Sequence, residues 1–125
     1  MDHTIRIVIA DDHAFVRTSL HSMLKLEQRL TVVAEAKNGS EAIAMVEKHR
    51  PDVVLMDISM SVLNGIDATR IINSKFPNTK VIVLNMHTDQ AYSDCAYAAG
   101  ASCFLAKGCD KDEILDAIME CSLGS

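Results

Sequence analysis

The sequence predicts an α/β fold in which five parallel strands form one sheet with helices on both faces. Short apolar runs rich in branched side chains alternate five times with longer segments of helical periodicity. Consecutive parallel strands need a crossover connection, which a helix provides. Continuous apolar runs such as Val53–Met56 and Val81–Leu84 indicate strands that are covered on both faces. The length of 125 residues fits a single domain with one sheet at its centre.

The predicted elements follow one another along the whole chain. The strands are expected at Ile5–Ala10, Thr31–Ala36, Asp52–Met56, Lys80–Leu84 and Ser102–Ala106. Apolar residues at helical spacing form one stripe on each of three predicted helices: Val16, Leu20, Met23 and Leu24 on the first, Ala68, Ile71, Ile72 and Phe76 on the third, and Ile114, Ala117, Ile118 and Cys121 on the last. Each stripe is suited to packing against a sheet.

Capping and turn residues mark where the helices begin and end. Asn38-Gly39-Ser40 opens the second helix, and Asp110 followed by Glu113 predicts an N-cap with a capping-box partner for the last one. Turn residues close the second, third and fourth helices at Arg50-Pro51, Phe76-Pro77-Asn78 and Gly100. The capping and turn residues therefore agree with the predicted alternation of strands and helices.

Composition and charge exclude several classes of protein. Lys and Arg number 12 against 17 Asp and Glu, a formal net charge of −5, whereas nucleic-acid binding needs clustered basic residues. We expect no direct contact with nucleic acid. No apolar run approaches the about 18 residues of a membrane span, and residues 1–6 lack signal-peptide features, so we expect a cytoplasmic domain away from membranes. The 4 cysteines and 5 histidines lack the spacing of a zinc site.

Polar side chains stand at the carboxyl ends of the predicted strands, where open parallel sheets bind ligands. They are Asp11 and Asp12 after the first strand, Asp57 after the third, Asn85 after the fourth and Lys107 after the fifth. Two carboxylates about 4 Å apart repel by about 4 kcal/mol at an effective dielectric constant of about 20, and a divalent cation removes that repulsion. The sequence thus predicts a magnesium site open to a phosphate. For Asp12 alone, a helix N-cap is an equally good interpretation.

Three segments carry a resemblance to a known family: Ile5–His13, Pro51–Ile58 and Leu105–Lys107. Together they resemble the receiver domain of bacterial two-component response regulators, over essentially the whole chain. Further residues are similar to the NarL/FixJ (LuxR-type) group of receivers: Ala10–His13 with Val16-Arg17, Asn38-Gly39, Asn64-Gly65-Ile66 and Met86-His87. The resemblance implies a flavodoxin-like, doubly wound, five-stranded parallel sheet of order 2-1-3-4-5 with five helices.

The resemblance also implies the roles of the residues at the strand ends. In the family, the aspartate matching Asp57 accepts a phosphoryl group from a sensor histidine kinase. Mg2+ would be held by Asp11, Asp12, Asp57 and the backbone carbonyl of Ser59, and Lys107 would contact the phosphoryl group. Phosphoryl transfer needs charge neutralisation and in-line positioning, which such a site provides.

Other positions match the family's switch and its control of dephosphorylation. The family usually has Ser or Thr where this chain has Asn85, so the amide would contact the phosphoryl group there and form the switch together with Phe104. A core role for Phe104 is an equally good interpretation. Ser59 and His87 match positions that tune dephosphorylation. We hypothesise that Asn85 leaves phosphorylation intact but weakens or alters its coupling to conformational change.

The resemblance implies a phosphorylation-dependent signalling domain that is no enzyme beyond its own phosphoryl transfer and dephosphorylation. Its expected partners are a sensor histidine kinase, a second copy of the domain after phosphorylation, and a C-terminal helix-turn-helix domain that regulates transcription. Residues 1–125 would be the receiver of a longer regulator whose output domain is missing here, and a stand-alone receiver is the alternative.

Three other functions compete with this interpretation. A pseudo-receiver or dimerisation module would signal without phosphate, and Asn85 is the feature that supports it. A phosphatase of the haloacid dehalogenase type needs Asp-x-Asp after the strand, where this chain has Asp57-Ile58-Ser59. A flavodoxin-like cofactor carrier is disfavoured because Asp11-Asp12-His13-Ala14 places acids where a phosphate cradle needs glycine and backbone donors.

Overall fold

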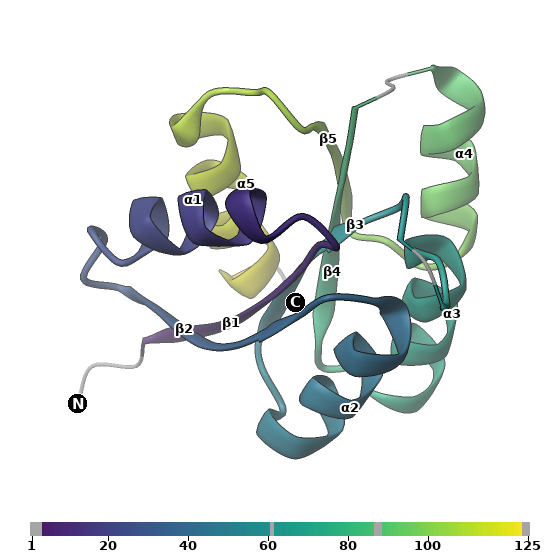
Figure 1. Ribbon diagram of the computed structural model, residues 1–125, viewed down its shortest axis with the longest axis horizontal. Helices are drawn as coiled ribbons and strands as arrows, with labels where there is room; N and C mark the ends of the chain where they lie inside the picture. The colour runs from purple at the N-terminus through teal and green to yellow at the C-terminus, as the bar shows by residue number, and fades with distance from the viewer. Residues whose placement is uncertain (1–3, 61, 87–88, 124–125) are drawn as a thin grey trace.

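A computed structural model of the protein describes residues 4–60, 62–86 and 89–123. Its strands are β1 (Ile5–Ala10), β2 (Leu30–Ala36), β3 (Val53–Asp57), β4 (Lys80–Asn85) and β5 (Cys103–Ala106). Its helices are α1 (Ala14–Leu24), α2 (Gly39–His49), α3 (Gly65–Lys75), α4 (Gln90–Ala98) and α5 (Lys111–Leu123). The strands form one parallel sheet in the order β2-β1-β3-β4-β5, which confirms the predicted fold class and strand order (Figure 1).

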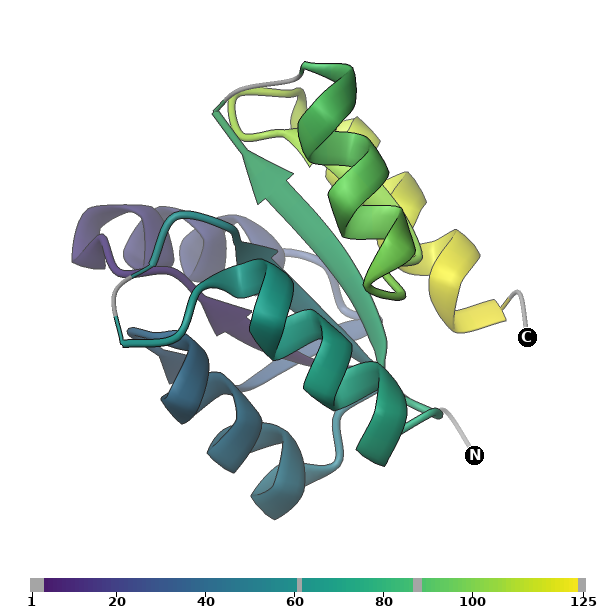
Figure 2. The ribbon, with the colours of Figure 1, turned by 90° about the vertical axis from the view of Figure 1, so that its right-hand side faces the viewer.

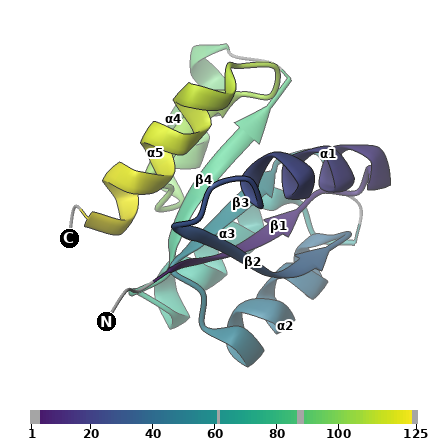
Figure 3. The same ribbon diagram turned by 90° about the vertical axis from the view of Figure 1, so that its left-hand side faces the viewer.

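The helices cover both faces of the sheet. Helices α3 and α4 lie on the face that Figure 2 presents, together with α2, whereas α1 and α5 lie on the opposite face in Figure 3. Among the described residues, no helix is both long and apolar enough to cross a membrane.

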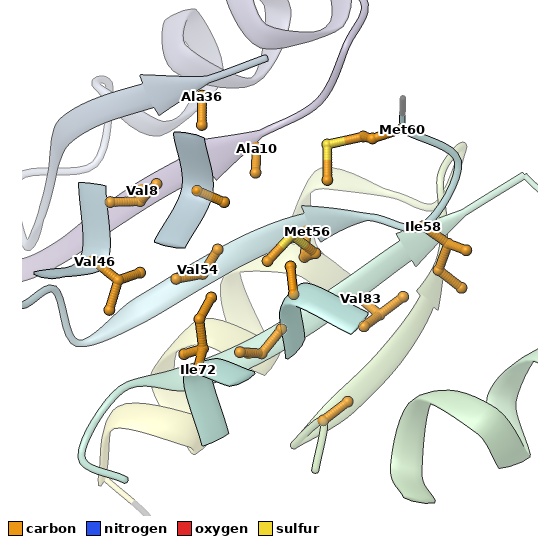
Figure 4. Close-up of a cluster of buried hydrophobic side chains, with 14 of the residues drawn as sticks. Val8, Ala10, Ala36, Val46, Val54, Met56, Ile58, Met60, Ile72 and Val83 are labelled. Atoms are coloured by element: carbon orange, nitrogen blue, oxygen red, sulfur yellow. The ribbon is translucent and has the colours of Figure 1, made fainter. Parts of the chain in front are cut away.

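Alternate residues of the central strands point to the two faces and form two cores. Val8, Val54 and Val83 pack with buried residues of α2, α3 and α4, as Figure 4 shows for Val46 and Ile72. On the other face, residues of β1, β3 and β4 pack against α1 and α5; they include Ile7, Leu55 and Ile82 on the sheet and Leu24 and Ile118 on the helices. Every residue of β3 is buried, which explains why its sequence is apolar without alternation.

Two strands extend one residue further at their carboxyl ends than the apolar pattern indicated. Strand β3 begins at Val53 rather than Asp52 and includes Asp57, because Asp57 continues the parallel pairing opposite Leu84. Strand β4 includes Asn85 for the same reason, since Asn85 pairs with Ala106 of β5. Backbone pairing therefore fixes both polar residues in the rigid sheet rather than in the loops that follow.

The helix ends agree with the capping residues in part. The side chain of Asn38 accepts the Glu41 backbone N–H at 2.8 Å, and Asn64 caps α3 in the same way. Arg50 ends α2 in the left-handed region, with φ of 48°. Helix α5 begins directly after Asp110, and the capping-box contact expected there stays a prediction.

Close packing of the loop after β3 depends on glycine. A Cβ on Gly65 would lie 2.0 Å from the Asp57 carbonyl oxygen, and one on Gly39 would lie 2.1 Å from the Leu63 carbonyl oxygen. The first helical residues of α2 and α3 therefore sit directly against the backbone that carries Asp57 and the loop behind it. This contact holds the end of β3 in place.

Candidate functional site

Four polar residues lie at the carboxyl edge of the sheet, where the sequence predicted them. They are Asp11 directly after β1, Asp57 at the end of β3, Asn85 at the end of β4 and Lys107 directly after β5. The strands are in register here, since Ala10 of β1 pairs with Met56 of β3, and Figure 4 shows the two side chains on the same face. The residue that follows each of them, Asp11 or Asp57, is thus carried to the same edge.

Lys107 joins the two buried carboxylates. Its Nζ lies 2.8 Å from Asp11 Oδ2 and 3.3 Å from Asp57 Oδ2. Asp11 is 2% exposed and Asp57 is 3% exposed, so both ion pairs are largely screened from water. The backbone N–H of Lys107 also donates to the Asn85 carbonyl oxygen at 2.8 Å, which fixes the start of the loop that follows β5. Lys107 is therefore not a solvated loop lysine.

One positive charge faces two negative charges, and the titration of these groups reflects the imbalance. Burial raises the pKa of Asp57, the negative charge of Asp11 raises it further, and Lys107 opposes both only in part. Burial alone lowers the pKa of Lys107, but its contacts with Asp11 and Asp57 outweigh that effect and leave the pKa raised. The site is thus short of positive charge.

A cluster of potential metal ligands surrounds Asp57. Asp11, Asp12, His13 and Asp57 each offer one ligand atom, and these atoms all lie within 4.8 Å of one another. Asp57 Oδ2 is buried and receives no hydrogen bond from the part of the chain that the structure describes. A buried carboxylate with an unused lone pair beside two further carboxylates fits a hard divalent cation such as Mg2+.

Asp12 does not cap α1. The N-cap is His13, and no side-chain hydrogen bond caps this helix among the described residues. The His13 backbone N–H donates instead to Asp11 Oδ1 at 2.8 Å. The carboxylate of Asp12 is exposed and belongs to the acidic cluster, so the N-cap interpretation of this residue is wrong.

The remaining predicted site residues have different surroundings. Ser59 is exposed, and its backbone N–H donates to Asp57 Oδ1 at 3.3 Å. Phe104 is partly buried against the core beneath α2, α3 and α4, and its backbone N–H donates to the Tyr97 hydroxyl of α4 at 3.2 Å. Asn85 is 2% exposed. His87 lies outside the described residues.

Two residues that contact Asp11 were not predicted as part of the site. His13 Nδ1 lies 3.2 Å from Asp11 Oδ1, and Arg17 Nη1 donates to the Asp11 carbonyl oxygen at 2.6 Å. Arg17 Nε also contacts Glu35 of β2 at 3.3 Å, so it connects the site to the edge strand. Helical periodicity could have indicated the contact of Arg17, because this residue lies one turn into the helix that follows Asp11 and Asp12 and can reach back to them.

A cavity of about 390 Å³ opens beside the acidic cluster. Its lining comes from the loops at the same edge: His13, Val16, Met86, Lys107 and Gly108. Lys107 thus faces both the buried carboxylates and open space. Through Lys107 the cavity borders the buried carboxylates.

Comparisons with known proteins agree with this geometry. The profile of the response regulator receiver domain matches residues 7–119. The transcriptional regulatory protein DegU of Brevibacillus brevis is 40% identical over 117 residues, which cover 94% of this chain and 50% of that protein. The oxygen regulatory protein NreC of Staphylococcus haemolyticus is 39% identical over 115 residues, 91% of this chain and 53% of that protein. The chain spans about half the length of these curated relatives.

A solved structure shares the whole fold. The signal receiver domain of the response regulator NarL from Mycobacterium tuberculosis superposes with a TM-score of 0.94 at 31% identity, covering 98% of this chain and 99% of that chain. The similarity therefore extends over all five strands and all five helices rather than over the acidic edge alone.

Proposed function

This chain belongs to the response regulator receiver family, within the NarL and DegU type, and from that premise we propose that it accepts a phosphoryl group on Asp57 from a sensor histidine kinase. The observation that carries the proposal is the placement of Asp57. Its carboxylate is buried at the end of a central strand, 3.3 Å from the Lys107 ammonium, and one of its oxygens receives no hydrogen bond from the described residues. The Asp57 carboxylate is therefore placed to act as a nucleophile.

The transfer itself needs few groups. An Asp57 carboxylate oxygen attacks the phosphorus, the bond between phosphorus and the kinase histidine nitrogen breaks, and that nitrogen keeps the electron pair. The product is an acyl phosphate on Asp57. Lys107, which contacts Asp57 and lines the adjacent cavity, then pairs with a phosphoryl oxygen.

Asp11, Asp12, Asp57 and the backbone carbonyl of Ser59 are the proposed ligands of Mg2+. The donor set suits this cation because it consists of hard oxygen atoms in a site that is short of positive charge. When bound, Mg2+ neutralises charge on the carboxylates and on the phosphoryl oxygens. Asp11 also orients Lys107 through the 2.8 Å ion pair, which keeps the ammonium beside the acceptor.

Asn85 and Phe104 are the proposed switch, and Ser59 and His87 the proposed positions that tune dephosphorylation. Asn85 stands at the end of β4 and its backbone carbonyl already accepts the Lys107 N–H. Its amide would donate to the phosphoryl group in place of the hydroxyl that the family usually has. The planar amide is bulkier than a hydroxyl and has little room to move in this buried position, so we propose a weakened or altered switch.

The whole regulator is proposed to act on transcription from the cytoplasm. Support comes from the relatives, of which DegU is named a transcriptional regulatory protein and which are about twice as long as this chain. We propose that a DNA-binding domain follows the receiver in the full protein and that phosphorylation favours a dimer. The receiver itself, with its net charge of −5, would not contact DNA.

The test is phosphate incorporation from acetyl phosphate with and without Mg2+, followed by intact mass. A gain of one phosphoryl group that requires Mg2+ and is absent in Asp57→Asn is the expected result. No gain in a folded protein that binds Mg2+ would favour the second candidate, a pseudo-receiver that signals without phosphate. The observation that favours this second candidate is Asn85, which stands where the family usually has a hydroxyl.

A further inference from the structure

The imidazole of His13 is part of the acidic cluster, yet the proposed magnesium site does not use it. His13 Nδ1 lies 2.9 Å from Asp12 Oδ1 and 3.2 Å from Asp11 Oδ1. These two carboxylates and Asp57 are the groups expected to hold the cation. A nitrogen atom therefore stands among oxygen ligands at the mouth of the site.

The distances from His13 Nδ1 to the two carboxylates are those of neighbouring ligands around one metal ion. With metal–ligand bonds of about 2.1 Å, neighbouring ligands of an octahedral ion are about 3.0 Å apart and opposite ones about 4.2 Å apart. The two distances from His13 Nδ1 match neighbouring positions. The ligand atoms of the whole cluster lie within 4.8 Å of one another, which is beyond the spacing of opposite ligands, so the side chains must draw slightly together around an ion.

A second observation points to a cation in the same place. Asp57 is 3% exposed, and its Oδ2 receives no hydrogen bond within the described part of the chain. Lys107 Nζ lies closer to Asp11 than to Asp57, at 2.8 Å against 3.3 Å, so it does not satisfy this oxygen fully. A further positive charge beside Asp57 would do so.

We propose that His13 Nδ1 is a ligand of the divalent cation in this site and shifts its preference from Mg2+ towards Mn2+, Co2+ and Ni2+. The inference rests on the proposed function, because it assumes that the cation binds between Asp12 and Asp57. Imidazole nitrogen binds these transition metals well, whereas Mg2+ keeps oxygen ligands and water. Metal binding by His13 would not remove a helix cap, because the His13 side chain caps no backbone group of α1 among the described residues.

The test compares Ni2+ and Mg2+ binding by calorimetry at one fixed pH in the wild type, His13→Asn and His21→Asn. His21 is the matched control because it lies on α1, which begins directly after His13, and its Nδ1 also contacts a carboxylate, Glu35 Oε2 at 2.8 Å, away from the cluster. We expect His13→Asn to lose at least about tenfold in Ni2+ affinity, since even outer partners of metal ligands contribute that much. Mg2+ affinity should change little, and His21→Asn should match the wild type.

Pulsed electron paramagnetic resonance of bound Mn2+ gives an independent readout. A nitrogen coupling from imidazole is expected in the wild type and in His21→Asn, and its absence is expected in His13→Asn. Asp57→Asn should weaken Mn2+ binding and lose the same coupling, which excludes a separate surface site on His13. A coupling that survives in His13→Asn would overturn the assignment.

Two further outcomes would also contradict the assignment, and they differ in what else they reject. If affinity for both Mg2+ and Ni2+ rises in His13→Asn, the imidazole competes with the cation for Asp11 and Asp12 rather than binding it. In that case Mg2+ still binds and the proposed function stands. If the wild type binds neither cation, the proposed function and this inference fail together.

Discussion

At the residue scale, the chemistry of the site follows from a deficit of positive charge. Asp11 and Asp57 are buried side by side, and Lys107 is the ammonium that contacts both. Because water cannot screen these groups well, the repulsion between the carboxylates persists in the folded protein. A bound cation would relieve this repulsion.

Asp57→Asn should stabilise the fold at neutral pH. Burial and Asp11 raise the pKa of Asp57 above its ordinary value of 3.8 in the folded protein. The folded state therefore holds this proton more tightly, which adds stability below the ordinary pKa and loses it as pH rises through the raised pKa. Removing the charge should add on the order of 1 kcal/mol to the unfolding free energy at neutral pH.

Urea unfolding of both proteins across acidic and neutral pH, without divalent cations, measures this effect. The stability difference should shrink as the pH falls towards the ordinary pKa of aspartate, because both proteins are then uncharged at this position. An equal difference at every pH, or a less stable variant, would show that Asp57 carries no unfavourable charge.

Asn85→Thr should strengthen the response to phosphorylation. Asn85 is 2% exposed at the end of β4, so a bulkier amide has little room to move towards a phosphoryl group. A threonine hydroxyl is smaller and can rotate. Amide NMR of Phe104, whose N–H donates to Tyr97, should show larger shift changes on phosphorylation in the variant than in the wild type. Equal changes would remove Asn85 as the cause of altered switching.

The sequence placed most candidate site residues at strand ends but did not predict their contacts. Asp57, Asn85 and Lys107 each follow an apolar run, so their position at a strand end could be predicted from the pattern alone. The contacts of His13 and Arg17 with Asp11 could not, because they depend on how α1 lies across the end of β1. Periodicity predicts which face of a helix is apolar, but it does not predict where along the strands the helix packs.

At the scale of elements, the loop between β3 and α3 positions the proposed phosphoacceptor. The Gly65 N–H donates to the Ile58 carbonyl oxygen at 2.9 Å, and the Asn64 side chain caps the helix that follows. Helix α3 thus begins against the last residue of β3. The sequence predicted both elements, but this contact arises only when they pack.

Gly65→Ala should therefore disturb both stability and phosphorylation. The new methyl group would lie 2.0 Å from the Asp57 carbonyl oxygen, which is backbone and cannot yield without moving the acceptor. We expect a loss of about 1–3 kcal/mol or more in unfolding free energy, as for other overpacked sites, and slower phosphorylation by acetyl phosphate.

Gly108→Ala is the matched control for that substitution. No described atom lies within 4 Å of a Cβ built on Gly108, although this residue follows Lys107 at the same edge of the sheet. Its stability should stay close to that of the wild type, and its phosphorylation should change less than in Gly65→Ala. If the two alanine variants behave alike, close packing against the Asp57 carbonyl is not what requires glycine at position 65.

At the scale of the whole molecule, the sheet order places the site. Strands β1, β3 and β4 are neighbours in the sheet. Asp11 and Asp57, which lie 46 residues apart in sequence, therefore meet at one edge. The alternation of strands and helices predicted a parallel sheet, but the order of the strands came from the resemblance to receivers. Apolar patterning alone is compatible with several orders.

Asp57 is the residue proposed to carry the phosphoryl group. Borohydride reduces an aspartyl phosphate to homoserine, so trapping after acetyl phosphate and Mg2+ treatment, followed by peptide mass spectrometry, locates the modified residue directly. We expect conversion at position 57, dependent on Mg2+ and absent from the untreated protein. Conversion at Asp11 or Asp12 instead, or no conversion in a folded protein that binds Mg2+, would contradict it.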